Sequence, residues 1–158
     1  MASLFYRCEK CGNFITFVGD KTACTPKCCG EPMTKLIAKT VDSEYIAGTG
    51  QPAPEGMGQG IPEKVETPAL VESIRKHVPD VTVDGEAVLV IVGSILHPMT
   101  EDHYIQFIHL ETENGGQFRF LKPDSEPKAV FHLAGEKPVA VYEYCTKHGL
   151  WGRRLSKD

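Results

Sequence analysis

Cysteines are concentrated at the start of this chain, and they constrain its fold more than any other feature. Five of the six cysteines lie within residues 1–38, where few apolar residues are available to build a core. A segment of about 40 residues or fewer usually needs a metal, disulfides or a partner in order to fold. The N-terminus lacks the long apolar stretch of a signal peptide, so we expect a cytoplasmic protein whose thiols stay reduced. Clustered reduced thiols indicate that residues 1–38 form a metal-bound module.

The spacing of these cysteines leaves two ligand sets open for that module. Cys8 and Cys11 are three residues apart, which lets two thiolates bind one ion across a tight turn. Their partners are either Cys24 with Cys28, as in a zinc ribbon, or the adjacent pair Cys28 and Cys29, which would distort the tetrahedron. A four-thiolate site accepts either iron or zinc. The spacing alone decides neither the ligands nor the metal.

The remainder of the chain predicts a linker followed by a mostly β domain. Residues 39–66 are rich in glycine and proline and lack helical or strand periodicity, so we expect a linker or loop. Thr67 and Pro68 form a helix start signal, and Pro79 ends the helix. Strand patterns occur at Phe14–Val18 and Met33–Ala38 in the module, then at Val81–Val83, Ala87–Val92, Tyr104–Leu110, Gln117–Leu121, Ala129–Leu133 and Val139–Tyr144. Residues 67–158 are therefore predicted to form a β-sandwich.

Charge and hydropathy argue against two classes of partner. The formal net charge is -4 and there is no block of lysine and arginine, which argues against nucleic acid as the main partner. The longest apolar run, Ala87–Val92, is far too short to cross a bilayer. We therefore expect a soluble protein that binds neither nucleic acid nor a membrane.

Four histidines and the sixth cysteine form a second candidate metal site in the C-terminal half. They lie in three short segments, each containing a proline or a glycine: Lys76-His77-Val78-Pro79, His97-Pro98 through His103-Tyr104, and Cys145-Thr146-Lys147-His148-Gly149. Neutral imidazoles with one thiolate make a strong ligand set for a first-row transition metal. His109 and His132 lie inside strand patterns without ligand-like neighbours, so we expect them to be ordinary core or surface residues.

These three segments resemble the superoxide reductase (neelaredoxin) domain, and Cys8-x-x-Cys11 with Cys28-Cys29-Gly30-Glu31-Pro32-Met33 resembles the desulforedoxin module. Together they resemble the two-iron desulfoferrodoxin family. The resemblance implies an immunoglobulin-like β-sandwich that follows a small iron-binding knob. It implies a catalytic non-haem iron with four equatorial histidines and one axial thiolate, which are His77, His97, His103, His148 and Cys145. It also implies an N-terminal iron, for which zinc is the alternative, held by Cys8, Cys11, Cys28 and Cys29, with Cys24 as an extra thiol.

The resemblance further implies an enzyme, a superoxide reductase that gives one electron to superoxide and releases hydrogen peroxide. Lys76, beside His77, is then the catalytic residue that attracts the anion, a rubredoxin-like protein is the electron donor, and we expect a homodimer. Two positions depart from the family pattern: Arg75 stands where a glutamate usually binds the oxidised iron, and Thr146 stands where an asparagine is common. Two other functions stay open, a rubredoxin-like electron carrier and a zinc-stabilised binding module without catalysis.

Overall fold

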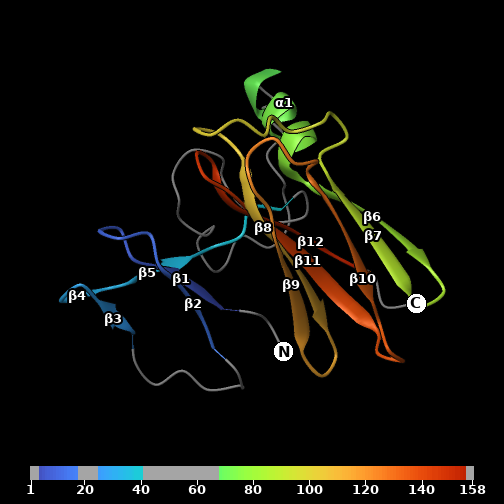
Figure 1. Ribbon diagram of the computed structural model, residues 1–158, viewed down its shortest axis with the longest axis horizontal. Helices are drawn as coiled ribbons and strands as arrows, with labels where there is room; N and C mark the ends of the chain where they lie inside the picture. The colour runs from blue at the N-terminus through green and yellow to red at the C-terminus, as the bar shows by residue number, and fades with distance from the viewer. Residues whose placement is uncertain (1–3, 18–24, 41–67, 156–158) are drawn as a thin grey trace, which may run out of the picture.

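The protein consists of a small cysteine-rich knob beside a β-sandwich (Figure 1). The structure is a computed structural model, and it describes residues 4–17, 25–40 and 68–155. Strands make up nearly all of the regular structure in these residues, so the predicted mostly β class is confirmed. No helix in these ranges is long and apolar enough to span a membrane. Cys24 and most of the predicted linker lie outside the described residues.

Five short strands build the knob. β1 (Phe5–Arg7) lies between β2 (Phe14–Thr16) and β5 (Thr34–Leu36) in an antiparallel sheet. β3 (Lys27–Cys28) and β4 (Glu31–Pro32) form a hairpin, whose turn holds Cys29 at φ 50° and Gly30 at φ 81°. The two strands predicted in this module are present but shorter than expected, and Val18 lies outside the described residues.

One helix and seven strands form the second unit. The helix α1 (Pro68–His77) begins at the predicted proline and ends before Pro79. The first sheet has the order β10-β7-β6, with β6 (Pro79–Asp84), β7 (Ala87–Val92) and β10 (Lys128–His132). The second has the order β12-β11-β8-β9, with β8 (Ile105–Thr112), β9 (Gly116–Phe120), β11 (Pro138–Cys145) and β12 (Gly149–Arg154). The predicted hairpin between β6 and β7 is present, with Gly85 at φ 55°.

Alternation along the strands places the sandwich core between the two sheets. In β7, Val88, Val90 and Val92 are buried and alternate with partly buried residues. They pack in one cluster with Ile108 of β8 and Val141 of β11, which belong to the opposite sheet. The β-sandwich expected for residues 67–158 is therefore the fold that this segment adopts over its described part.

Aromatic side chains join the knob to the sandwich. Phe5 of β1 is only 2% exposed, and its ring centroid lies 5.5 to 6.3 Å from four rings of the second sheet. These rings belong to Phe107, His109, Phe118 and Tyr142. His109, which was expected to be an ordinary core or surface residue, is buried in this cluster. The knob and the sandwich therefore share one continuous apolar contact.

The sequence patterns do not predict β12. Leu150, Trp151 and Gly152 are all buried, so this strand lacks the alternation by which the others are recognised. A Cβ atom on Gly152 would lie 2.8 Å from the ring of Tyr142 in β11, so only glycine fits this close approach. A strand carrying two glycines resembles a loop when its partner strand is unknown.

Candidate metal centres

The four histidines and Cys145 are brought together at one end of the sandwich by different elements. His77 is the last residue of α1, and Cys145 is the last residue of β11. His148 lies in the turn that leads from β11 to β12. His97 and His103 lie in the connection between β7 and β8. The ligands thus sit at the ends of regular elements or in the loops that join them, on a rigid scaffold.

One ligand atom from each of these five residues lies within 4.8 Å of all the others. His77 Nε2 lies 3.2 Å from His97 Nε2 and 2.9 Å from His148 Nδ1. His148 Nδ1 lies 3.2 Å from His103 Nε2 and 3.4 Å from the sulfur of Cys145. The predicted set therefore converges on one point, with no predicted member missing.

Hydrogen bonds on the outer side of two rings decide which nitrogen faces inward. His77 Nδ1 donates to the carbonyl oxygen of Ser73 at 2.7 Å, and His97 Nδ1 donates to that of Pro98 at 2.5 Å. The inward Nε2 atoms of His77 and His97 then both carry lone pairs, and at 3.2 Å neither can donate to the other. Such an arrangement is repulsive unless a cation lies between the nitrogens. The donor set therefore fits a metal ion.

Burial keeps these imidazoles neutral. It lowers the pKa of His77 to about 3 and that of His97 to about 4, and it also lowers the pKa of His103 and His148. Protons therefore do not compete with a metal for these nitrogens at neutral pH. Burial has the opposite effect on Cys145, whose thiol pKa is raised. A buried thiolate at this position needs a cation beside it.

Contacts between the ligand-bearing loops hold the cluster in shape. The backbone N–H of Thr146 donates to the carbonyl of Tyr104 at 3.0 Å, and the hydroxyl of Thr146 accepts from the N–H of Tyr104 at 3.1 Å. Lys147 forms an ion pair with Asp102 at 2.7 Å. The indole of Trp151 stacks on the ring of His77, with centroids 4.8 Å apart. Thr146, noted above as a departure, thus links the loop that carries His103 to the turn that carries His148.

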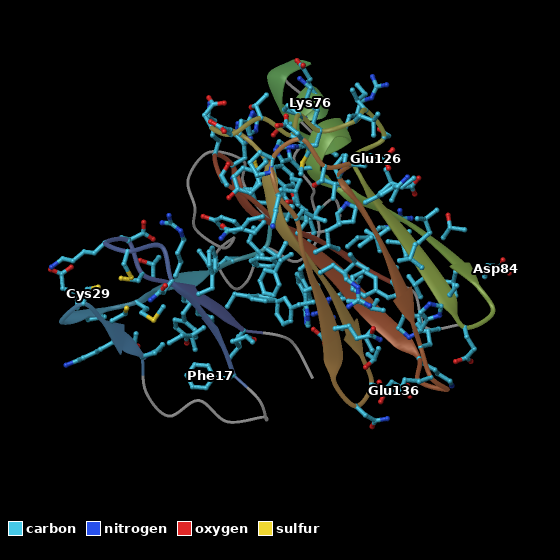
Figure 2. All side chains as sticks on the ribbon, in the orientation of Figure 1. Phe17, Cys29, Lys76, Asp84, Glu126 and Glu136 are labelled. Atoms are coloured by element: carbon cyan, nitrogen blue, oxygen red, sulfur yellow. The ribbon has the colours of Figure 1, made fainter. Side chains whose placement is uncertain are left out.

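Lys76, which is labelled in Figure 2, lies in the last turn of α1 and directly precedes His77 of the cluster. Its side chain is 35% exposed, and its ammonium forms an ion pair with Glu72 at 2.5 Å, one helical turn away. Its positive charge acts on three of the histidines, and it helps to lower the pKa of His97, His103 and His148 after the larger effect of burial. Arg75, next to Lys76, is exposed. The last turn of the helix therefore carries two cations, of which Lys76 acts on the candidate site.

The second group of candidate ligands lies at the outer tip of the knob, where Cys29 is labelled in Figure 2, far from Lys76. The sulfur atoms of Cys8, Cys11, Cys28 and Cys29 lie within 4.8 Å of one another. Hydrogen bonding from the backbone of Cys11 lowers the pKa of Cys8 to about 7, whereas hydrogen bonding with the thiol of Cys11 raises the pKa of Cys29 to about 12. Four such thiols cannot all ionise without a cation, so this set also fits a metal ion.

Two residues beside the histidine cluster were not identified from the sequence. Glu143 is fully buried two residues before Cys145, and burial raises its pKa well above the usual range. Its position in a strand could have indicated this, because it alternates with the buried Val141 and Cys145. Lys39 donates to the carbonyl of His148 at 2.9 Å. No sequence signal indicates this contact, because the two residues are far apart in the chain.

Comparisons with known proteins agree with this arrangement. A family model described as Desulfoferrodoxin matches residues 70–154, more than half of the chain. The desulfoferrodoxin of Nitratidesulfovibrio vulgaris is 34% identical over 150 residues, which cover 92% of this chain and 91% of that protein. The desulfoferrodoxin of Syntrophotalea carbinolica is 33% identical over 146 residues, covering 92% and 91%. Among solved structures, the superoxide reductase from Treponema pallidum matches with a TM-score of 0.70 at 27% identity, covering 97% of this chain and 98% of that one.

Proposed function

The chain belongs to the desulfoferrodoxin family, and from this membership we propose that it is a superoxide reductase. The observation that carries the proposal is the convergence of four imidazole nitrogens and one thiol on a single point, in a chain that resembles a superoxide reductase along nearly its whole length. Superoxide, one electron and two protons give hydrogen peroxide, so the reaction releases no oxygen. The cell is thereby relieved of superoxide, which is a defence against oxidative stress.

The proposed catalytic centre is an iron held by His77, His97, His103, His148 and Cys145. Iron bound there supplies the single electron that superoxide accepts. The histidines are neutral, so only the thiolate offsets the charge of the metal, and the centre stays attractive to an anion. Backbone N–H groups of Lys147 and His148 hydrogen-bond the sulfur of Cys145 and favour its thiolate form.

Lys76 is proposed to guide superoxide to this centre. A protein of net charge -4 repels an anion at long range, so a local positive field must overcome that repulsion. Lys76 supports this role because its charge reaches three of the histidines. Arg75, which is exposed, adds a second positive charge to the same helical turn. Glu72 pairs with Lys76 and orients it, at the cost of part of its charge.

The knob is proposed to hold a second iron through Cys8, Cys11, Cys28 and Cys29, with zinc as the alternative metal. We propose the division of the chain into residues 1–38 as the iron-binding module, 39–66 as the linker, and 67–158 as the reductase domain. A rubredoxin-like protein is the proposed electron donor. The protein is further proposed to act in the cytoplasm as a homodimer.

A pair of serine variants tests the assignment of the two centres. The iron-loaded protein and its Cys145→Ser and Cys8→Ser variants are compared by metal analysis, visible spectrum and superoxide reduction with excess chemical reductant. Cys145→Ser should abolish superoxide reduction and keep the spectrum of the N-terminal iron. Cys8→Ser should lose that spectrum and keep superoxide reduction. If Cys8→Ser removed most of the superoxide reduction, the assignment of two separate centres would be wrong.

A further inference from the structure

The segment that leaves the knob pairs through Lys39 with the edge of the second sheet, which has the order β12-β11-β8-β9. The N–H of Lys39 donates to the carbonyl of Leu150 at 3.0 Å, and the N–H of Gly152 donates to the carbonyl of Lys39 at 2.9 Å. These bonds form a parallel bridge between Lys39 and Trp151 of β12, which is the edge strand of its sheet. The backbone of Lys39 is thus held by two hydrogen bonds that do not depend on its side chain.

The side chain of Lys39 points to the turn that carries His148. Its ammonium donates to the carbonyl oxygen of His148 at 2.9 Å and lies 5.3 Å from the centre of the Trp151 ring. That indole in turn stacks on the ring of His77. The ammonium of Lys39 therefore contacts the backbone of one candidate ligand, His148, and the indole that stacks on another, His77.

Lys39 differs from the other cations near the cluster in the carboxyl group on which its charge acts, which is that of the fully buried Glu143. Burial raises the pKa of Glu143 well above the usual range, which keeps this carboxyl group neutral. Lys76 and Lys147, which also flank the cluster, are neutralised in part by ion pairs with Glu72 and Asp102. Within the described ranges, no ion pair of Lys39 is found at 4.0 Å or less. The positive charge of Lys39 acts on both Cys145 and His148, and it is among the effects that lower the pKa of each group.

We propose that Lys39 is a positioning residue that raises the reduction potential of the catalytic iron, by holding an unpaired positive charge against the turn from Cys145 to His148. The inference rests on the proposed function, because it assumes iron in this cluster. A nearby cation opposes the gain of positive charge on oxidation, so it favours the reduced form of the metal. Lys39 lies three residues after β5, so the segment that leaves the knob supplies a charge that acts on the cluster.

Reduction potentials of both irons in the same sample test this inference. The full-length, iron-loaded protein is titrated in a spectroelectrochemical cell, together with Lys39→Met, Lys39→Gln and Lys39→Arg. Methionine removes the charge and the hydrogen bond, glutamine keeps a donor without the charge, and arginine keeps the charge. Lys128→Met is the matched control, because it removes one positive charge from β10, where Lys128 pairs with the exposed Glu126.

Lys39→Met and Lys39→Gln should each shift the equilibrium of the catalytic iron about tenfold toward the oxidised form, which is a potential lower by about 59 mV. Lys39→Arg and Lys128→Met should stay near the wild-type potential, and the N-terminal iron should keep its potential in every variant. An unchanged catalytic potential in Lys39→Met or Lys39→Gln would refute the role of the charge. An equal shift in Lys128→Met would refute its location. The potentials can be measured even if the wild-type protein fails to reduce superoxide, an outcome that would contradict the proposed function instead.

Discussion

Replacement of Phe5 by alanine should loosen the knob from the sandwich. The ring of Phe5 is 2% exposed and contacts four rings of the second sheet, so its removal leaves a cavity in the middle of the aromatic contact. Phe→Ala substitutions at buried sites cost about 3–5 kcal/mol, and we expect about 4 kcal/mol here. With a urea slope of about 2 kcal/mol per molar, the midpoint of the affected transition should fall by about 2 M.

Two optical signals separate the two units in this experiment. The visible absorption of the N-terminal iron reports the knob, and the fluorescence of Trp151, the only tryptophan in the chain, reports the sandwich. We expect the urea midpoint of the knob transition in Phe5→Ala to fall by the full shift of about 2 M. Ile15→Ala is the matched control, because Ile15 lies in the same sheet of the knob and is 37% exposed, and it should cost less than about 1 kcal/mol. A loss for Phe5→Ala no greater than that of Ile15→Ala would refute the docking role of the aromatic contact.

Three further predictions follow from the two centres. Cys24→Ala should keep the iron content and visible spectrum of the wild type, because four other thiols complete the N-terminal site; loss of the N-terminal metal would support the zinc-ribbon pairing instead. In the metal-free protein, the free energy of unfolding should fall as pH drops from about 6.5 to about 4. The unfolded chain binds protons in this range, whereas the folded His77 and His97, with pKa values of about 3 and 4, do not. Each histidine contributes up to about 1.4 kcal/mol per pH unit to this slope, and an unchanged slope in His97→Gln would contradict the prediction. Arg75→Glu should weaken azide binding to the oxidised catalytic iron, because it reverses a charge next to Lys76 in the last helical turn. Azide titrations with equal affinity for both proteins would refute this steering effect.

Local patterns predict several of the elements that position the ligands. The Thr67-Pro68 start and the Pro79 stop correctly predict a helix that ends at His77. The Asp84-Gly85 pair correctly predicts the turn between β6 and β7, where Gly85 has positive φ. These signals are local, because each depends on the backbone preferences of a few adjacent residues.

Features that depend on distant pairing could not be predicted in this way. β12 is recognisable only once β11 is beside it, because Gly152 is required by the ring of Tyr142. Lys39 was assigned to a linker on composition, yet it pairs with Trp151 and contacts His148. The inward nitrogens of His77 and His97 likewise depend on which carbonyl each ring meets in the folded chain. Residue spacing does not contain this information.

The yield of products from superoxide tests the central claim most directly. Superoxide is generated by a radiation pulse in a solution of the reduced, iron-loaded protein, and the peroxide and oxygen formed are both measured. A superoxide reductase yields one peroxide for each superoxide consumed and no oxygen, whereas dismutation yields one peroxide and one oxygen for every two. We predict the first outcome for the wild-type protein, and we expect Cys145→Ser to lose this superoxide reduction. An oxygen yield approaching half of the superoxide consumed would contradict the proposed reaction.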